Sequence, residues 1–194
     1  MAAASAMIDY PVRLEIAYPE DGNRFLILVR WLLAIPHIVV LYFLSIAVTV
    51  LTVIAWLAIL FTGRYPEGIF RFVVGVQRWS MNINAYIGFH DLYPPFSMNA
   101  GEYAPVTYDV TRQESYNRLL IFVKWLLAIP HLVVVGVLQI VAVVAWLVLL
   151  VIVLVTGTYH RGIFDFIVGV ARWNARLTAY LYLMVDRYPP FSMR

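Results

Sequence analysis

The sequence predicts an all-α membrane protein made of a tandem duplicated repeat, with short β-strands at its surface. Hydrophobic residues make up 63% of the chain and charged residues 13%, whereas a soluble domain is about 45–50% apolar and about 25% charged. Two runs, 38–61 and 132–155, contain no charged residue. Nearly the whole chain repeats, which predicts two membrane repeats, 10–98 and 103–193, in one membrane domain.

Composition excludes several classes of function. Thirteen of the fourteen cations are arginines scattered singly, so no basic cluster indicates nucleic-acid binding, and membrane lipids are the expected partner. The absence of cysteine excludes disulfides and thiolate metal sites. Residues 1–10 lack the basic and apolar regions of a cleavable signal peptide, so the first apolar run is expected to direct insertion.

The repeat is strongest at the flanks of the apolar runs. The segment 23–37 returns as 117–131, and 93–98 returns as 188–193 after a one-residue insertion. The centres of the runs differ at most positions and keep only their hydrophobicity, which is typical of helix surface that faces lipid. Specific packing is therefore expected in the flanks.

Each copy opens with an alternating segment. Apolar and polar residues alternate over 12–16 and again over 106–110, and a period of two predicts β-strands. Because two strands alone are marginally stable in water, they are expected to pair with each other or with a neighbouring subunit, outside the bilayer.

An apolar run with one cation comes next. The run 25–35 carries Arg30, which is Lys124 in the second copy, and Pro36 is expected to kink or end a helix. Each uncharged run of 24 residues would be about 36 Å long as a helix, enough to span a hydrocarbon core of about 30 Å. Thr-Gly then ends the helix.

The third element of each copy, 68–90 and 162–186, is apolar on one face and polar on the other. An arginine at the bilayer centre costs about 2.5–3.5 kcal/mol. We therefore expect an amphipathic helix in the membrane interface, with Trp79 and Trp173 at headgroup depth; a second spanning helix with buried arginine is the alternative. Tyr-Pro-Pro-Phe ends the helix.

The number of membrane passes stays open. With one crossing per copy, the loop between the runs carries six cations and the two tails share eight, so the positive-inside rule gives no orientation. If each copy returns to the same side, all fourteen cations lie on one face. This favours an even number of passes per copy, either a hairpin within 25–61 or the long run followed by the third element.

His37 and His131 are the candidate cofactor-binding residues. Each follows Ile-Pro at the edge of an apolar run. A pseudo-twofold arrangement would bring them together, and two histidines at membrane depth could ligate haem or a chlorophyll-type pigment. The favoured interpretation is that each histidine bonds to backbone carbonyls freed by the proline, with no cofactor and no metal.

Eight further residues form the candidate lipid or interface sites. They are Arg30, Trp31, Lys124, Trp125, Arg78, Trp79, Arg172 and Trp173. The first two cations are expected to reach lipid phosphates by snorkelling. Three roles are open for Arg78 and Arg172 of the third element: they line a pore, they pair with acids such as Glu67 or Asp165, or they belong to a polar face in contact with water. The last role is favoured. Glycines spaced by seven, at 68 and 75 and at 162 and 169, indicate close helix packing.

Sequence motifs give no sign of catalysis. There is no phosphate-binding loop, no G-x-G-x-x-G, no H-E-x-x-H and no G-x-S-x-G. We expect a non-enzymatic accessory or assembly subunit of a homo-oligomer or of a larger respiratory or photosynthetic membrane complex. The alternatives are a small channel or transporter, and a haem- or pigment-binding subunit.

The paired Arg/Lys-Trp-Leu-Leu-Ala-Ile-Pro-His motifs and the paired Tyr-Pro-Pro-Phe-Ser motifs resemble a family of bacterial membrane proteins of unknown function, frequent in actinobacteria. The resemblance covers 10–193. It implies a multi-pass protein of the bacterial inner membrane and carries over no activity, substrate or catalytic residue.

Overall fold

The computed structural model describes residues 10–19 and 21–194. The expectation that residues 1–10 form no signal peptide therefore lies outside the described residues, except at Tyr10. The chain is mostly helical with one small sheet. Its elements are β1 (Val12–Ile16), α1 (Leu26–Leu33), α2 (Ile35–Thr62), α3 (Glu67–Gly88), β2 (Val106–Val110), α4 (Leu120–Thr156) and α5 (Arg161–Leu181). Both strands have the bounds that the sequence predicts.

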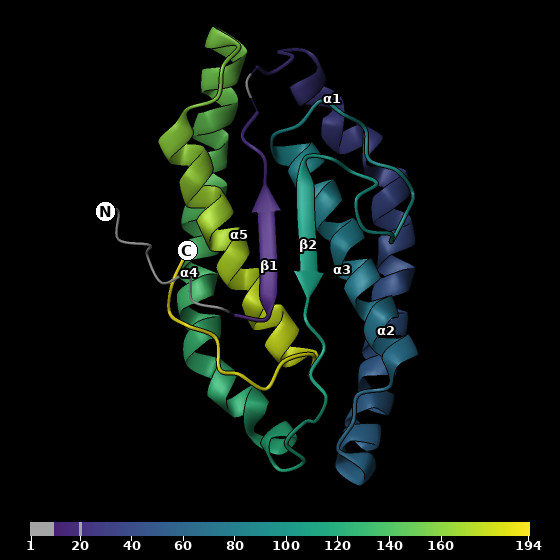
Figure 1. Cartoon of the computed structure of the whole chain (residues 1–194). Coiled ribbons are helices and arrows are strands. Elements are labelled where there is room, and N and C mark those ends of the chain that lie inside the picture. The colour runs from purple at the N-terminus through teal and green to yellow at the C-terminus, as the bar shows by residue number, and fades with distance from the viewer. Residues whose placement is uncertain (1–9, 20) are drawn as a thin grey trace, which may run out of the picture.

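The elements form layers that run along one long axis (Figure 1). The sheet lies in front, α3 and α5 lie behind it, and the long helices α2 and α4 pack against α3 and α5. The strands are exchanged between the repeats: β1 of the first repeat packs on α5, and β2 of the second repeat packs on α3. Each repeat therefore completes the core of the other.

The two strands pair antiparallel around a central pair, Leu14 opposite Tyr108. These two residues are equivalent positions of the repeat, 94 residues apart, and both side chains are buried on the same face. A local twofold axis perpendicular to the sheet therefore passes between them. The rotation about this axis exchanges the two repeats, and both repeats keep their strand on the same face of the molecule.

At the C-terminal end of each long helix, a backbone carbonyl accepts a hydrogen bond from the other repeat. α2 ends at Gly63 and α4 at Gly157, both in the left-handed conformation that favours glycine, with φ of 70° and 79°. The carbonyl of Gly157 accepts a hydrogen bond from the Gly22 amide at 3.0 Å, and that of Gly63 accepts one from the Tyr116 amide at 2.9 Å. The segment before α1 thus lies beside the end of α4, and the segment before α4 lies beside the end of α2.

Proline acts differently in the two copies. In the first copy the helix breaks at Ala34, and α2 begins with Pro36 in its first turn, where proline is tolerated. In the second copy α4 continues through Pro130. The expected helix end therefore occurs in one repeat only.

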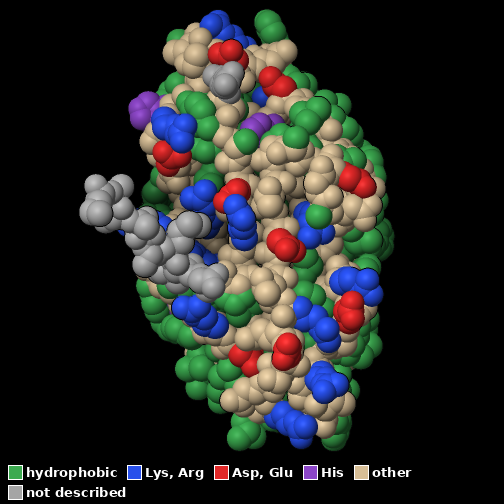
Figure 2. Space-filling model, in the orientation of Figure 1, with side chains coloured by type: hydrophobic (Ala, Val, Ile, Leu, Met, Phe, Trp, Pro, Cys, Tyr) green, Lys and Arg blue, Asp and Glu red, His purple; other side chains and the backbone are tan. Residues whose placement is uncertain are grey.

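Two helical segments, Leu26–Thr62 and Leu120–Thr156, are long and apolar enough to cross a membrane. Only 11% and 17% of their most apolar windows are buried inside the protein, so most of their side chains face outward. On the sheet face, by contrast, charged side chains are spread along the length of the molecule, and hydrophobic side chains gather at the rim (Figure 2).

Candidate functional site

The cations of the repeated motif turn inward from the long helices. Arg30 is fully buried, forms an ion pair with Asp91 and donates to the Tyr159 hydroxyl at 3.1 Å. The Lys124 ammonium lies 2.8 Å from a carboxylate oxygen of Asp186. Both cations are thus placed under the helix surface instead of being extended toward lipid headgroups, and a buried charge needs such a partner.

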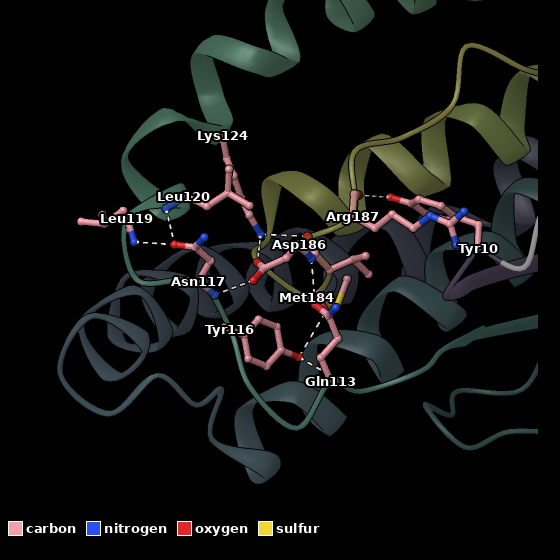
Figure 3. Close-up of polar contacts among 11 residues, drawn as sticks. Tyr10, Gln113, Tyr116, Asn117, Leu119, Leu120, Lys124, Met184, Asp186 and Arg187 are labelled. Atoms are coloured by element: carbon pink, nitrogen blue, oxygen red, sulfur yellow. Dashed lines mark hydrogen bonds and ion pairs between the residues drawn. The ribbon is translucent and has the colours of Figure 1, made fainter.

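The two aspartates also bind the segments that precede α1 and α4. Asp186 accepts the Asn117 amide at 2.6 Å, and the Asn117 side chain in turn accepts the amides of Leu119 and Leu120 at 3.0 and 3.2 Å (Figure 3). Asp91 accepts the Asn23 amide at 3.0 Å. Each aspartate stands two residues before Tyr-Pro-Pro in its copy, a signal that could have identified both.

Further hydrogen bonds tie the segment around Asp186 to the rest of the chain (Figure 3). The Tyr116 hydroxyl donates to the Met184 carbonyl at 3.2 Å, and the Tyr10 hydroxyl donates to the Arg187 carbonyl at 2.9 Å. Burial raises the pKa of both tyrosines, so both hydroxyls keep their protons and act as donors. The last loop of the second repeat is thereby fixed to the start of the first.

Each histidine forms an aromatic cluster within its own repeat. His37 Nδ1 accepts a hydrogen bond from the Trp79 indole at 3.0 Å, and its ring stacks on Phe96 with centroids 3.7 Å apart. The equivalent cluster joins His131 to Trp173 at 3.0 Å and stacks it on Phe191 at 3.9 Å; these three positions carry the same residue types as in the first repeat.

The two histidines lie in separate clusters that share no residue. Because Nδ1 accepts from an indole, the proton lies on Nε2, and Nε2 of both rings is buried without a hydrogen-bond partner among the described residues. The expected hydrogen bonds from the histidines to backbone carbonyls are therefore not formed at either ring within the described part of the chain. Trp79 and Trp173 lie inside the protein, whereas Trp31 and Trp125 stay on the outer surface, 59% and 63% exposed.

One arginine of α3 and one of α5 bind the sheet. Arg78 donates to the Tyr108 carbonyl at 2.9 Å and to the Met98 carbonyl at 2.8 Å. Arg172 donates to the Leu14 carbonyl at 3.1 Å. The acids named in the sequence hypothesis are engaged elsewhere: Glu67 pairs with Arg71 and Arg112, and Asp165 pairs with Arg161.

At Gly75 and Gly169, the segment that packs closely on the glycine is a loop and not a second helix. A Cβ at Gly75 would lie 2.8 Å from the Cβ of Met98, and one at Gly169 would lie 2.9 Å from the Cβ of Met193. The end of each Tyr-Pro-Pro-Phe-Ser-Met segment therefore lies directly on the helix of its own repeat. The glycine spacing marks this contact.

A cavity of about 310 Å³ opens between α3, α4 and α5. Its lining is mostly apolar, with the side-chain amides of Asn84, Gln139 and Asn174 and the indole of Trp146, and contains no titratable group. Within residues 10–19 and 21–194, no group of three or more histidine, aspartate or glutamate side chains could hold a metal ion. The cavity can accept an apolar group but offers no acid, base or nucleophile.

A family model described as Domain of unknown function (DUF4389) matches residues 25–98 and 118–193, which is more than half of the chain and falls on both repeats. No curated protein and no solved structure matches the chain.

Proposed function

The chain belongs to the family described as Domain of unknown function (DUF4389), and on that premise we propose that it is a non-enzymatic integral protein of the bacterial inner membrane. In this proposal it acts as an accessory or assembly subunit, in a homo-oligomer or in a larger membrane complex such as a respiratory or photosynthetic one.

The observation that carries the proposal is the outward apolar surface of α2 and α4. Equivalent residues at the middle of the two helices, Val50 and Val144, are each 56% exposed. A soluble protein would bury such a surface against its own core or against a partner. Lipid is the solvent in which helices that are apolar on nearly every side are stable.

The polar residues of the repeat support a structural role. Arg30 and Lys124 are buried and pair with aspartates, and Arg78 and Arg172 bind strand carbonyls. Each of these groups is occupied by a contact within the chain, and none points into the cavity described above. These contacts support a structural role for the repeated motifs.

The sheet and the apolar surface support assembly. The sheet has two strands, so each strand has one outer edge, and such edges can pair with another chain. The exposed indoles of Trp31 and Trp125 add large surfaces of the kind enriched at membrane interfaces and at protein contacts.

The experiment that tests the proposal is fractionation followed by native mass measurement. We expect the chain to stay in the membrane pellet after alkaline carbonate washing and to leave mild detergent as a colourless assembly heavier than one chain. Recovery in the soluble fraction would overturn the membrane assignment, and a partner-free monomer in nanodiscs would overturn the assembly role. Solute or ion flux in proteoliposomes would instead favour a channel.

A further inference from the structure

We infer that the protein lies flat in one leaflet, with the long axes of α2 and α4 parallel to the membrane plane and the charged sheet face in water. The inference rests on the proposed membrane residence and adds which surface meets lipid. The occupant of the apolar surface is the acyl-chain region of a single leaflet.

The exposed charges of the sheet favour the flat orientation. Arg13, Glu15 and Asp109 point outward from the sheet, with side chains 66%, 50% and 68% exposed. The strands run parallel to the long helices and lie midway along them (Figure 1). If the helices stood upright in the bilayer, these charges would lie at mid-membrane depth, where charged groups are rare and face protein or a water-filled cavity.

The backbone of the sheet favours the same orientation. Arg172 and Arg78 bind the carbonyls of Leu14 and Tyr108, but each strand of the two-stranded sheet has an outer edge that faces no other strand. Open sheet edges do not occur in contact with hydrocarbon, because unpaired backbone groups lose water without gaining a partner. An upright chain would place both edges in the hydrocarbon region. A flat orientation keeps them at the water side.

The length of α4 also favours the flat orientation. α4 has 37 residues, about 55 Å of helix, against a hydrocarbon core of about 30 Å. The one cation in it, Lys124, is buried, so the outer surface is uncharged from end to end, with Gln139 as its exposed polar side chain near the middle. Fitting this length upright needs a tilt of roughly 55–60°, beyond the usual 0–40° range. One leaflet, about 15 Å of hydrocarbon, accommodates a layer of helices about 10–12 Å across.

The twofold symmetry between the repeats favours the flat orientation as well. The local twofold axis is perpendicular to the sheet, through the Leu14–Tyr108 pair. In the flat orientation this axis is the membrane normal, so both repeats meet the same lipid and the same water. In the upright orientation the axis lies in the membrane plane, and the nearly identical flanks 23–37 and 117–131 would face opposite sides of the membrane.

Labelling of single cysteines tests the orientation, because the chain has no cysteine of its own. The repeat supplies matched positions. Asp21→Cys and Ser115→Cys mark opposite ends of the molecule, Thr107→Cys marks the sheet, and Val50→Cys and Val144→Cys mark the apolar surface; all five residues are exposed. The probe is a membrane-impermeant maleimide, applied to native vesicles of both orientations, with the unmodified chain as the control.

We expect Asp21→Cys, Ser115→Cys and Thr107→Cys to react from the same side with similar yields. Val50→Cys and Val144→Cys should react only after detergent is added. Reaction of the two end positions from opposite sides, or protection of Thr107→Cys while both ends react, would overturn the flat orientation. Loss of the chain to the soluble fraction would overturn membrane residence itself, which separates the two failures.

Discussion

At the scale of single residues, the two repeats solve one problem with different side chains. Arg30 and Lys124 occupy equivalent positions and are both buried against an aspartate. The sequence predicts that the cations matter, but not that they turn inward, because their partners, Asp91 and Asp186, lie about sixty residues along the chain. Only the folded chain brings them together.

Removing the charge of Asp186 should therefore destabilise the fold. The Lys124–Asp186 pair is largely buried, with side chains 2% and 17% exposed, and loss of one partner of a buried ion pair costs about 3–5 kcal/mol. We expect Asp186→Asn to lower the free energy of unfolding in detergent by about 3 kcal/mol. The matched control is Asp109→Asn, whose carboxylate is exposed beside Arg78 and should change stability by less than about 1 kcal/mol. Equal effects of the two variants would contradict the role of the buried pair.

The aromatic clusters give a second prediction at this scale. Trp79→Phe and Trp173→Phe each remove the indole donor to a histidine, and the loss of one hydrogen bond that leaves a buried acceptor costs about 1–3 kcal/mol. Because the clusters share no residue, the two losses should add in the double variant to within about 0.5 kcal/mol. Thermal or denaturant unfolding of the four proteins measures this. A strongly non-additive double variant would show that the histidines are coupled.

At the scale of elements, the sequence is most informative where local periodicity decides the structure. The strands Val12–Ile16 and Val106–Val110 have their predicted bounds, because alternation alone specifies them. The third element of each copy is a helix, as predicted, but α3 lies between α2 and β2. Its burial could not be predicted, because an amphipathic pattern reports one apolar face and does not say whether protein or lipid covers it.

Two glycines of α3, Gly75 and Gly68, allow the effect of packing to be measured apart from the effect of helix propensity. In Gly75→Ala the new methyl would meet Met98, whereas Gly68 has no atom within 4 Å of an added Cβ. We expect Gly75→Ala to cost about 1–3 kcal/mol and Gly68→Ala to be neutral or stabilising by up to about 1 kcal/mol. Unfolding of both variants and of Gly169→Ala checks this. A stabilising Gly75→Ala would show that the loop does not need the close approach.

At the scale of the whole molecule, the decisive feature is the exchange of strands between the repeats. The sequence predicts the duplication, and it leaves open whether the strands pair with each other or with a neighbouring subunit; both repeats look self-contained in sequence. Only the tertiary contacts show that β1 completes the second repeat and β2 the first.

The exchange predicts the behaviour of separated halves. Chains cut within the exposed turn at 99–102 should each be unstable alone, because each lacks the strand that covers its own helix. Expressed together, they should associate and copurify from the membrane. Tagging one half and measuring recovery of the other checks this, with two copies of the same half as the control. A half that folds and stays monomeric would contradict the exchange.

The central pair of the sheet has a consequence for the origin of the chain. Because Leu14 and Tyr108 are the same position of the repeat, a single ancestral repeat could have paired with an identical copy of itself through this strand. Gene fusion would then have joined a homodimer that already had this shape. Once joined, the halves were free to diverge, and the replacement of a serine at 45 by glutamine at the equivalent position 139 is a difference that no homodimer can have.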